Sequence, residues 1–100
     1  MQKILHLEDF RDKVGDNFIL HVQDDIRVSV RLAAVEPRPI QEYRGRLRDP
    51  FSLMFDGEPG HRLPQRIYRL EHASGESYDI FIVPIQRNED DGLRYQAVFN

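Results

Sequence analysis

The chain has 100 residues, of which 40% are hydrophobic and 31% are charged, and this balance excludes an intrinsically disordered chain. Fourteen Lys and Arg against seventeen Asp and Glu give a net charge of -3, so no overall positive field favours nucleic-acid binding. The absence of Cys excludes disulfides, thiolate zinc sites and thiol catalysis. We therefore expect one domain over residues 1–100, long enough to bury its own core.

The first ten residues contain only a short apolar pair, Ile4 and Leu5, before charged residues follow, which is too short for the core of a signal peptide. Elsewhere no stretch approaches the roughly 18 apolar residues of a membrane span. These features predict a cytoplasmic protein with no membrane partner.

The first predicted element is a short helix over residues 7–14. Leu7, Phe10, Arg11 and Val14 stand at offsets of three, four and seven, so they share one helical face that is apolar apart from the long side chain of Arg11. Gly15 is the expected end of this helix, and the apolar period changes from helical to alternating directly after it.

Alternation of apolar and polar residues predicts strands in the rest of the chain. The expected strands cover residues 18–23, 26–32, 51–55, 66–72, 78–85 and 93–99. The clearest is 26–32, with Ile26, Val28, Val30 and Leu32 expected to face inward. The two-residue link Asp24–Asp25 before it predicts an antiparallel hairpin.

The strand over residues 78–85 is apolar on both faces, which is typical of a central strand or of a strand that is covered on both sides. Pro84 favours a strand exit or an edge position, because proline has no N–H to donate to a neighbour. Short strands joined by turns, with no helix long enough for a parallel crossover, predict a mainly β fold. We expect a small antiparallel barrel or sandwich of about six strands with a short N-terminal helix.

Four histidines, His6, His21, His61 and His72, raise the question of a metal site, but their spacing is not that of a ligand set. His21 and His72 could still meet across strands. The acidic run 89–92 lacks the alternating ligands of a calcium-binding EF-hand loop. We expect no metal and no cofactor.

Catalytic signals are weak. Ser29, Ser52, Ser74 and Ser77 lie outside any Gly-x-Ser-x-Gly turn, and the single, scattered glycines form no phosphate-binding loop. The sequence therefore favours a protein that is not an enzyme.

A long polar segment over residues 37–50 holds the one locally basic stretch of the chain. Its candidate partner contacts are Arg38, Tyr43, Arg44, Arg46 and Arg48. An aromatic ring among arginines suits an acidic partner or single-stranded nucleic acid, while the plain alternative is a loop kept soluble by its charge. With the acidic net charge, we expect a protein partner or self-association, through this segment or an unpaired strand edge.

One alternative function remains open. A β-barrel can bind a small ligand at its mouth, where Tyr43, His21 or His72 would supply polar contacts.

Four segments resemble a family of bacterial proteins of about 100 residues and unknown function. These segments are Pro50–Phe55, Leu63–His72, Phe81–Ile85 and Tyr95–Asn100, the last reading Tyr-Gln-Ala-Val-Phe-Asn. Glu8–Phe10 and Val14–Gly15 fit the same pattern, so the resemblance covers nearly the whole chain. It implies a bacterial origin and genes near those of phage-tail-like or tail-collar proteins, and it supplies no catalytic residues.

Overall fold

A computed structural model of the chain describes residues 4–23, 25–39, 49–57, 63–87 and 93–99. The described elements are α1 (Glu8–Arg11), β1 (Asn17–Gln23), β2 (Ile26–Pro37), β3 (Phe51–Gly57), β4 (Arg66–His72), β5 (Ser77–Arg87) and β6 (Leu93–Phe99). The mainly β fold with one short helix is confirmed, and each predicted strand is present.

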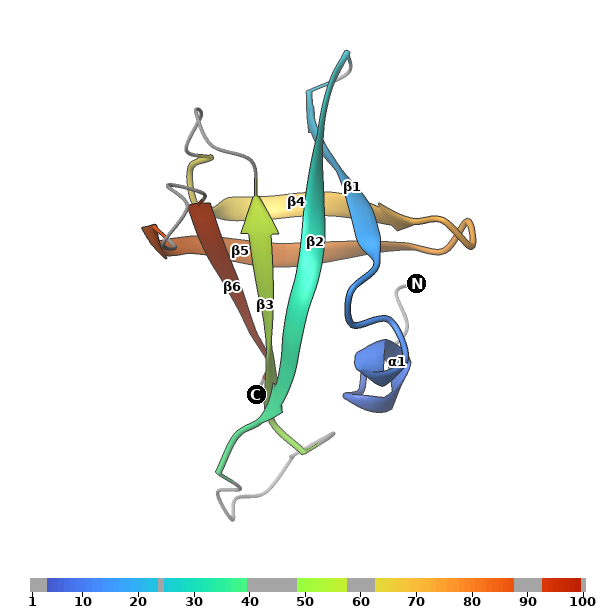
Figure 1. The fold of residues 1–100 in the computed structure, drawn as a ribbon, viewed down its shortest axis with the longest axis vertical. Coiled ribbons are helices and arrows are strands. Elements are labelled where there is room, and N and C mark those ends of the chain that lie inside the picture. The colour runs from blue at the N-terminus through green and yellow to red at the C-terminus, as the bar shows by residue number, and fades with distance from the viewer. Residues whose placement is uncertain (1–3, 24, 40–48, 58–62, 88–92, 100) are drawn as a thin grey trace.

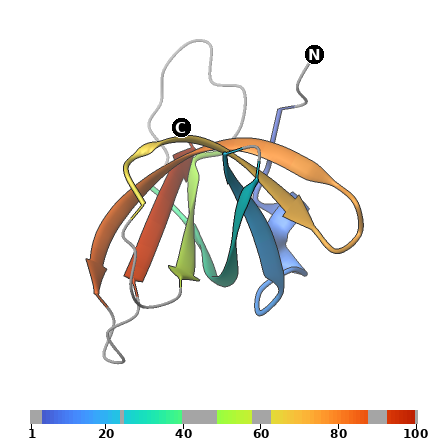
Figure 2. The same cartoon turned by 90° about the horizontal axis from the view of Figure 1, so that it is seen from above.

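The six strands form a closed antiparallel barrel in the order β1-β2-β3-β6-β5-β4. β4 and β5 run across the direction of the other four strands (Figure 1) and arch over them when the molecule is seen from above (Figure 2). Because the sheet closes on itself, every strand has a neighbour on both sides. Within the described residues, positions 34–37 of β2 are nevertheless paired with β3 alone, so a partner contact through a strand edge stays a prediction.

The interior is built by the alternating residues of each strand, because successive side chains of a strand point to opposite faces. Leu32 pairs with Phe55, Phe55 with Tyr95, and Leu20 with Leu70, so inward-facing residues stand opposite one another from strand to strand. All five are buried, and they belong to one hydrophobic core cluster.

One end of the barrel is closed by the short helix. Phe10 of α1 is fully buried, and its ring lies 5.1 Å from Tyr78, 6.2 Å from Phe51 and 6.4 Å from Phe99, measured between ring centroids. These residues come from β5, β3 and β6. A helix of four residues cannot be stable by itself, so α1 depends on this packing.

Two inward-facing predictions were wrong. Ile26 is 47% exposed, because the β1–β2 hairpin projects beyond the barrel (Figure 1) and a register shift lies between His21 and Gln23. Val14, expected on the buried helix face, is 48% exposed, because α1 ends at Arg11 and residue 14 lies in the following turn.

Of the two expectations for the strand from residue 78, the central position agrees with β5 lying between β6 and β4, whereas the covering of both faces is wrong. In β5, Tyr78, Ile80 and Ile82 are buried inside the barrel, whereas Phe81 on the outer face is 51% exposed. Pro84, expected at a strand exit or an edge, instead lies inside β5 and pairs with Tyr95, next to the shift of the β5–β6 register between Pro84 and Gln86. The shift accommodates a residue that has no N–H to donate.

Candidate functional site

A cleft of about 260 Å³ opens where α1 lies beside the end of β2 and the start of β3. Its lining residues are His6, Leu7, Glu8, Arg11, Pro37, Arg38, Asp49 and Pro50. Figure 1 shows α1 at the same end of the molecule as the point where β2 ends and β3 begins. The cleft therefore joins two parts of the chain that are distant in sequence.

A hydrogen bond from a backbone N–H holds each wall of the cleft in position. On one wall, the His6 N–H donates to the Asp9 carboxylate at 2.8 Å, which fixes the entry into α1. On the other, the Arg38 N–H donates to the Pro50 carbonyl at 3.0 Å, which holds the two ends of the β2–β3 connection together. Arg11 and Arg38 are thus carried by backbones that are held in place.

The charges of the cleft are mixed, with two guanidinium groups, one imidazole and two carboxylates. In the part of the chain that the structure describes, neither the Arg11 nor the Arg38 guanidinium takes part in a hydrogen bond or an ion pair. Both residues are exposed at the cleft. A guanidinium recognises carboxylate or phosphate through paired hydrogen bonds, so these two groups can bind an anionic group.

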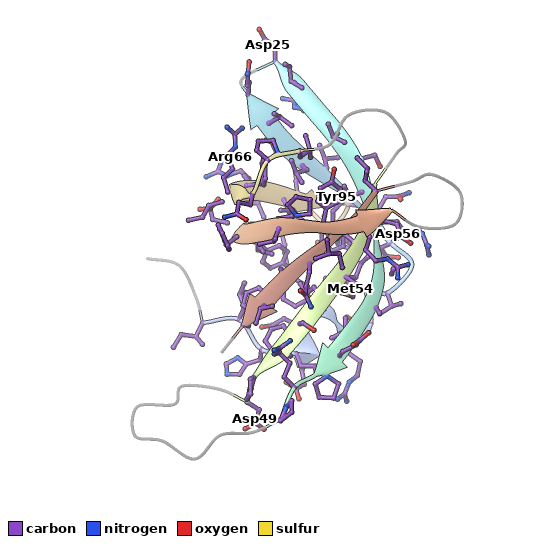
Figure 3. All side chains as sticks on the ribbon, turned by 90° about the vertical axis from the view of Figure 1, so that its left-hand side faces the viewer. Asp25, Asp49, Met54, Asp56, Arg66 and Tyr95 are labelled. Atoms are coloured by element: carbon purple, nitrogen blue, oxygen red, sulfur yellow. The ribbon has the colours of Figure 1, made fainter. Side chains whose placement is uncertain are left out.

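Two arginines of the barrel are already paired with one carboxylate. Arg31 of β2 and Arg94 of β6 both donate to Asp56 of β3, at 3.1 and 3.0 Å. Figure 3 shows Asp56 beside the barrel and Asp49, a cleft residue, at one end of the molecule. Both arginines thus share the Asp56 carboxylate, and these ion pairs link neighbouring strands on the surface of the sheet.

Of the five predicted partner contacts, the structure describes one, Arg38, and places it in the cleft. Tyr43, Arg44, Arg46 and Arg48 lie outside the described residues. Arg11 was not predicted as a site residue, because no local sequence pattern links it to position 38.

His21 and His72 do not meet. His21 lies on the outer face of β1, where its Nε2 is 3.1 Å from the Glu71 carboxylate. His72 pairs with Phe18 in the β1–β4 ladder, and Phe18 faces the interior. Since the two imidazoles belong to opposite faces of the sheet, the meeting across strands that the sequence left open does not occur. Within the described ranges there is no cluster of three or more His, Cys, Asp or Glu that could hold a metal ion.

The structure brings together Asp16, His72 and Ser74, which the sequence analysis did not connect. The His72 Nε2 lies 2.8 Å from the Asp16 carboxylate, and the Nδ1 lies 3.0 Å from the Ser74 hydroxyl. Nδ1 also accepts the Ser74 N–H at 3.2 Å, so this nitrogen is the acceptor and Nε2 carries the proton given to Asp16. The Ser74 hydroxyl accepts the Glu76 N–H at 3.3 Å in the same turn. These contacts join two turns, which is a structural role.

The buried side chains of the barrel belong to one core cluster. Among the described residues, the cleft beside α1 is a place where the small ligand of the alternative function could bind. No described helix is long and apolar enough to cross a membrane.

One family model matches residues 5–99 of the chain, and its description is a domain of unknown function. No curated protein and no solved structure matches the chain.

Proposed function

The chain belongs to the DUF6916 family, whose description assigns no activity, and we propose from the cleft geometry that it is a non-enzymatic protein-interaction module. The observation that carries the proposal is that Arg11 of α1 and Arg38, the residue after β2, line one cleft and that neither guanidinium has a partner among the described residues. The proposed partner presents an acidic segment to this end of the barrel.

The charge distribution supports an acidic protein segment as the occupant. The chain is negative overall, so a long-range field does not favour polyanions such as nucleic acid. Locally, Arg38 begins a segment that contains three further arginines up to position 48. A short acidic peptide can use this local charge, because recognition of carboxylates by arginine clusters depends on contacts within a few ångströms.

The wider setting of the proposal depends on the resemblance of the sequence to short bacterial proteins. We propose that the partner belongs to a phage-tail-like assembly and that the chain is cytoplasmic before it joins this assembly. No cofactor, membrane or nucleic acid is part of the proposed function.

The proposal is tested by titrating the ¹⁵N-labelled protein with an acetylated hexaglutamate peptide and, separately, with acetate. We expect amide shifts at residues 6–11, 37–39 and 49–50, weaker binding at high salt, and much weaker binding of acetate. Arg11→Gln and Arg38→Gln should each weaken peptide binding about fivefold, since an exposed ion pair contributes up to about 1 kcal/mol.

The matched control is Arg27→Gln, because Arg27 is an exposed arginine on β2, opposite His21 and away from the cleft residues. Peptide affinity should be unchanged in this variant. Absence of shifts with millimolar hexaglutamate, or equal weakening by Arg27→Gln, would show that the cleft does not bind acidic segments.

A further inference from the structure

The outer face of the β4–β5 pair carries two large apolar side chains directly opposite each other. Ile67 pairs with Phe81 in the antiparallel register, and the two residues are 66% and 51% exposed. Single exposed apolar residues are common on protein surfaces, but a directly paired set forms a continuous patch. Because the barrel is closed, a partner of this patch must lie over the face of the sheet.

The next outward-facing pair along the same two strands is charged. Arg69 stands opposite Asp79, with the Arg69 Nε 3.6 Å from the Asp79 carboxylate, and the two side chains are 63% and 50% exposed. The face therefore presents an apolar pair and, beside it, a pair of opposite charges.

We propose that two copies of the chain associate through this face, with β4 of one copy over β5 of the other. A two-fold axis that runs parallel to the strands, midway between β4 and β5, exchanges the two strands and keeps each pair at its own level. Ile67 of one copy then lies over Phe81 of the other, and Arg69 lies over Asp79. The face is thus complementary to itself, because apolar side chains meet apolar side chains and opposite charges meet. An isologous dimer requires such self-complementarity.

The size of the patch sets the strength of the association. Stable interfaces bury roughly 800 Å² on each partner, whereas a phenylalanine side chain contributes at most about 250 Å². Two half-exposed apolar side chains with two charged neighbours make a small interface. We expect a weak dimer with a dissociation constant on the order of 0.1 mM. Its affinity is well below that of an interface of standard size.

The association is measured by sedimentation velocity and by amide shifts of the full chain between about 0.02 and 1 mM, a range that brackets the expected constant. We expect the sedimentation coefficient to rise with concentration, and shifts to concentrate at residues 66–71 and 77–82. Phe81→Ser should raise the dissociation constant at least tenfold. Ile26→Ser is the control, because Ile26 is 47% exposed on the β1–β2 hairpin and should leave association unchanged.

Variants with reversed charge at Arg69 or Asp79 distinguish an ion pair between two copies from the ion pair within one copy. Arg69→Asp alone and Asp79→Arg alone each place like charges over one another in a two-fold dimer, so each variant should be monomeric by itself. A mixture of the two variants places opposite charges over one another and should form a heterodimer. Within each single variant the intramolecular pair remains like-charged, so recovery on mixing can come only from a contact between copies.

A wild-type chain that remains monomeric at 1 mM would overturn the proposal. So would association that is insensitive to Phe81→Ser, or variants that fail to associate on mixing. None of these outcomes bears on peptide binding at the cleft, which involves different residues.

Discussion

The carboxylate of Asp16 and the imidazole of His72 lie 2.8 Å apart, although 56 positions separate the two residues in the sequence. The contact joins the turn before β1 to the end of β4, and the His72 ring also packs against Phe18 at a centroid distance of 5.0 Å. The His72 side chain is only 13% exposed, so its hydrogen bonds are largely sheltered from water.

Asp16→Ala should therefore destabilise the fold by about 1 kcal/mol, because the sheltered imidazole N–H loses its acceptor. The measurement is the free energy of unfolding in urea at neutral pH. Asp25→Ala is the matched control, since Asp25 is an exposed aspartate at the tip of the β1–β2 hairpin (Figure 3), and its removal should change stability by less than about 0.5 kcal/mol. Equal effects of the two substitutions would contradict the structural role of the Asp16–His72 contact.

Phe10→Ala should destabilise the fold by about 3–5 kcal/mol, the range observed when a buried phenylalanine is truncated and a cavity remains. Phe10 is fully buried against rings of β3, β5 and β6, and it is the main anchor of α1. The expected readouts are a lowered midpoint of thermal unfolding and increased exchange of the α1 amides.

Val14→Ala provides the comparison for Phe10→Ala. Val14 lies three residues beyond α1 and is 48% exposed, so its truncation should cost less than about 0.5 kcal/mol. A small effect of Phe10→Ala would mean that the barrel end closes without the helix.

Gly57→Ala should destabilise the barrel by about 1–3 kcal/mol, because a methyl group at this position overpacks the interior. A Cβ added to Gly57 would stand 2.8 Å from Cε2 of the Tyr95 ring. This ring cannot move freely, since it is buried and its hydroxyl accepts the Leu63 N–H at 3.2 Å. The free energy of unfolding measures the effect.

A double-mutant cycle tests the cause of this loss. In a Tyr95→Leu background the obstructing ring is gone, so Gly57→Ala should cost clearly less than in the wild-type chain. An unchanged cost would place the strain elsewhere in β3.

The stability of the fold should fall as the pH rises above about 10, and Tyr78 should account for part of this loss. Burial raises the pKa of Tyr78 far above its ordinary value of 10.0, and a hydrogen bond of 2.5 Å to Glu76 and nearby carboxylates act in the same direction. The folded state thus keeps the phenol proton to a higher pH than the unfolded state does. The stabilisation is complete below pH 10 and is lost as the pH rises toward the folded pKa.

Tyr78→Phe removes this titration. At pH 8.5 the variant should be less stable by about 1 kcal/mol, because the hydrogen bond to Glu76 is lost. Between pH 8.5 and 11 its unfolding free energy should decrease less than that of the wild-type chain. Identical pH dependence in both proteins would contradict the raised pKa as a source of alkaline sensitivity.

The strands and most of the interior could be predicted from the sequence. Alternation of apolar residues in segments such as 51–55 and 93–99 specifies one buried face, because the pleat of a strand fixes side-chain direction every second residue. Phe51, Leu53 and Phe55 are all buried as expected. The resemblance to short proteins of unknown function is likewise confirmed, through the family match over residues 5–99.

The cleft could be predicted only in part. Arg38 was identified because it begins a locally basic segment, whereas Arg11 was assigned to a helix face and has no sequence neighbour that marks it as a binding residue. The two arginines line one cleft because α1 lies beside the end of β2 and the start of β3, and no local sequence pattern predicts this arrangement. The exposure of Phe81 was mispredicted for a related reason, since apolar character alone does not show whether another layer covers a strand.

The sequence by itself thus determined a mainly β fold, its strand positions and most of the residues that face its core, because these follow from local periodicity and side-chain chemistry. Tertiary structure alone decided how the barrel closes, which apolar face of β5 remains in water, and which distant residues meet at Asp16–His72 and in the cleft. Those relationships depend on strand order and register, and hence on the free energy of packing the whole chain at once.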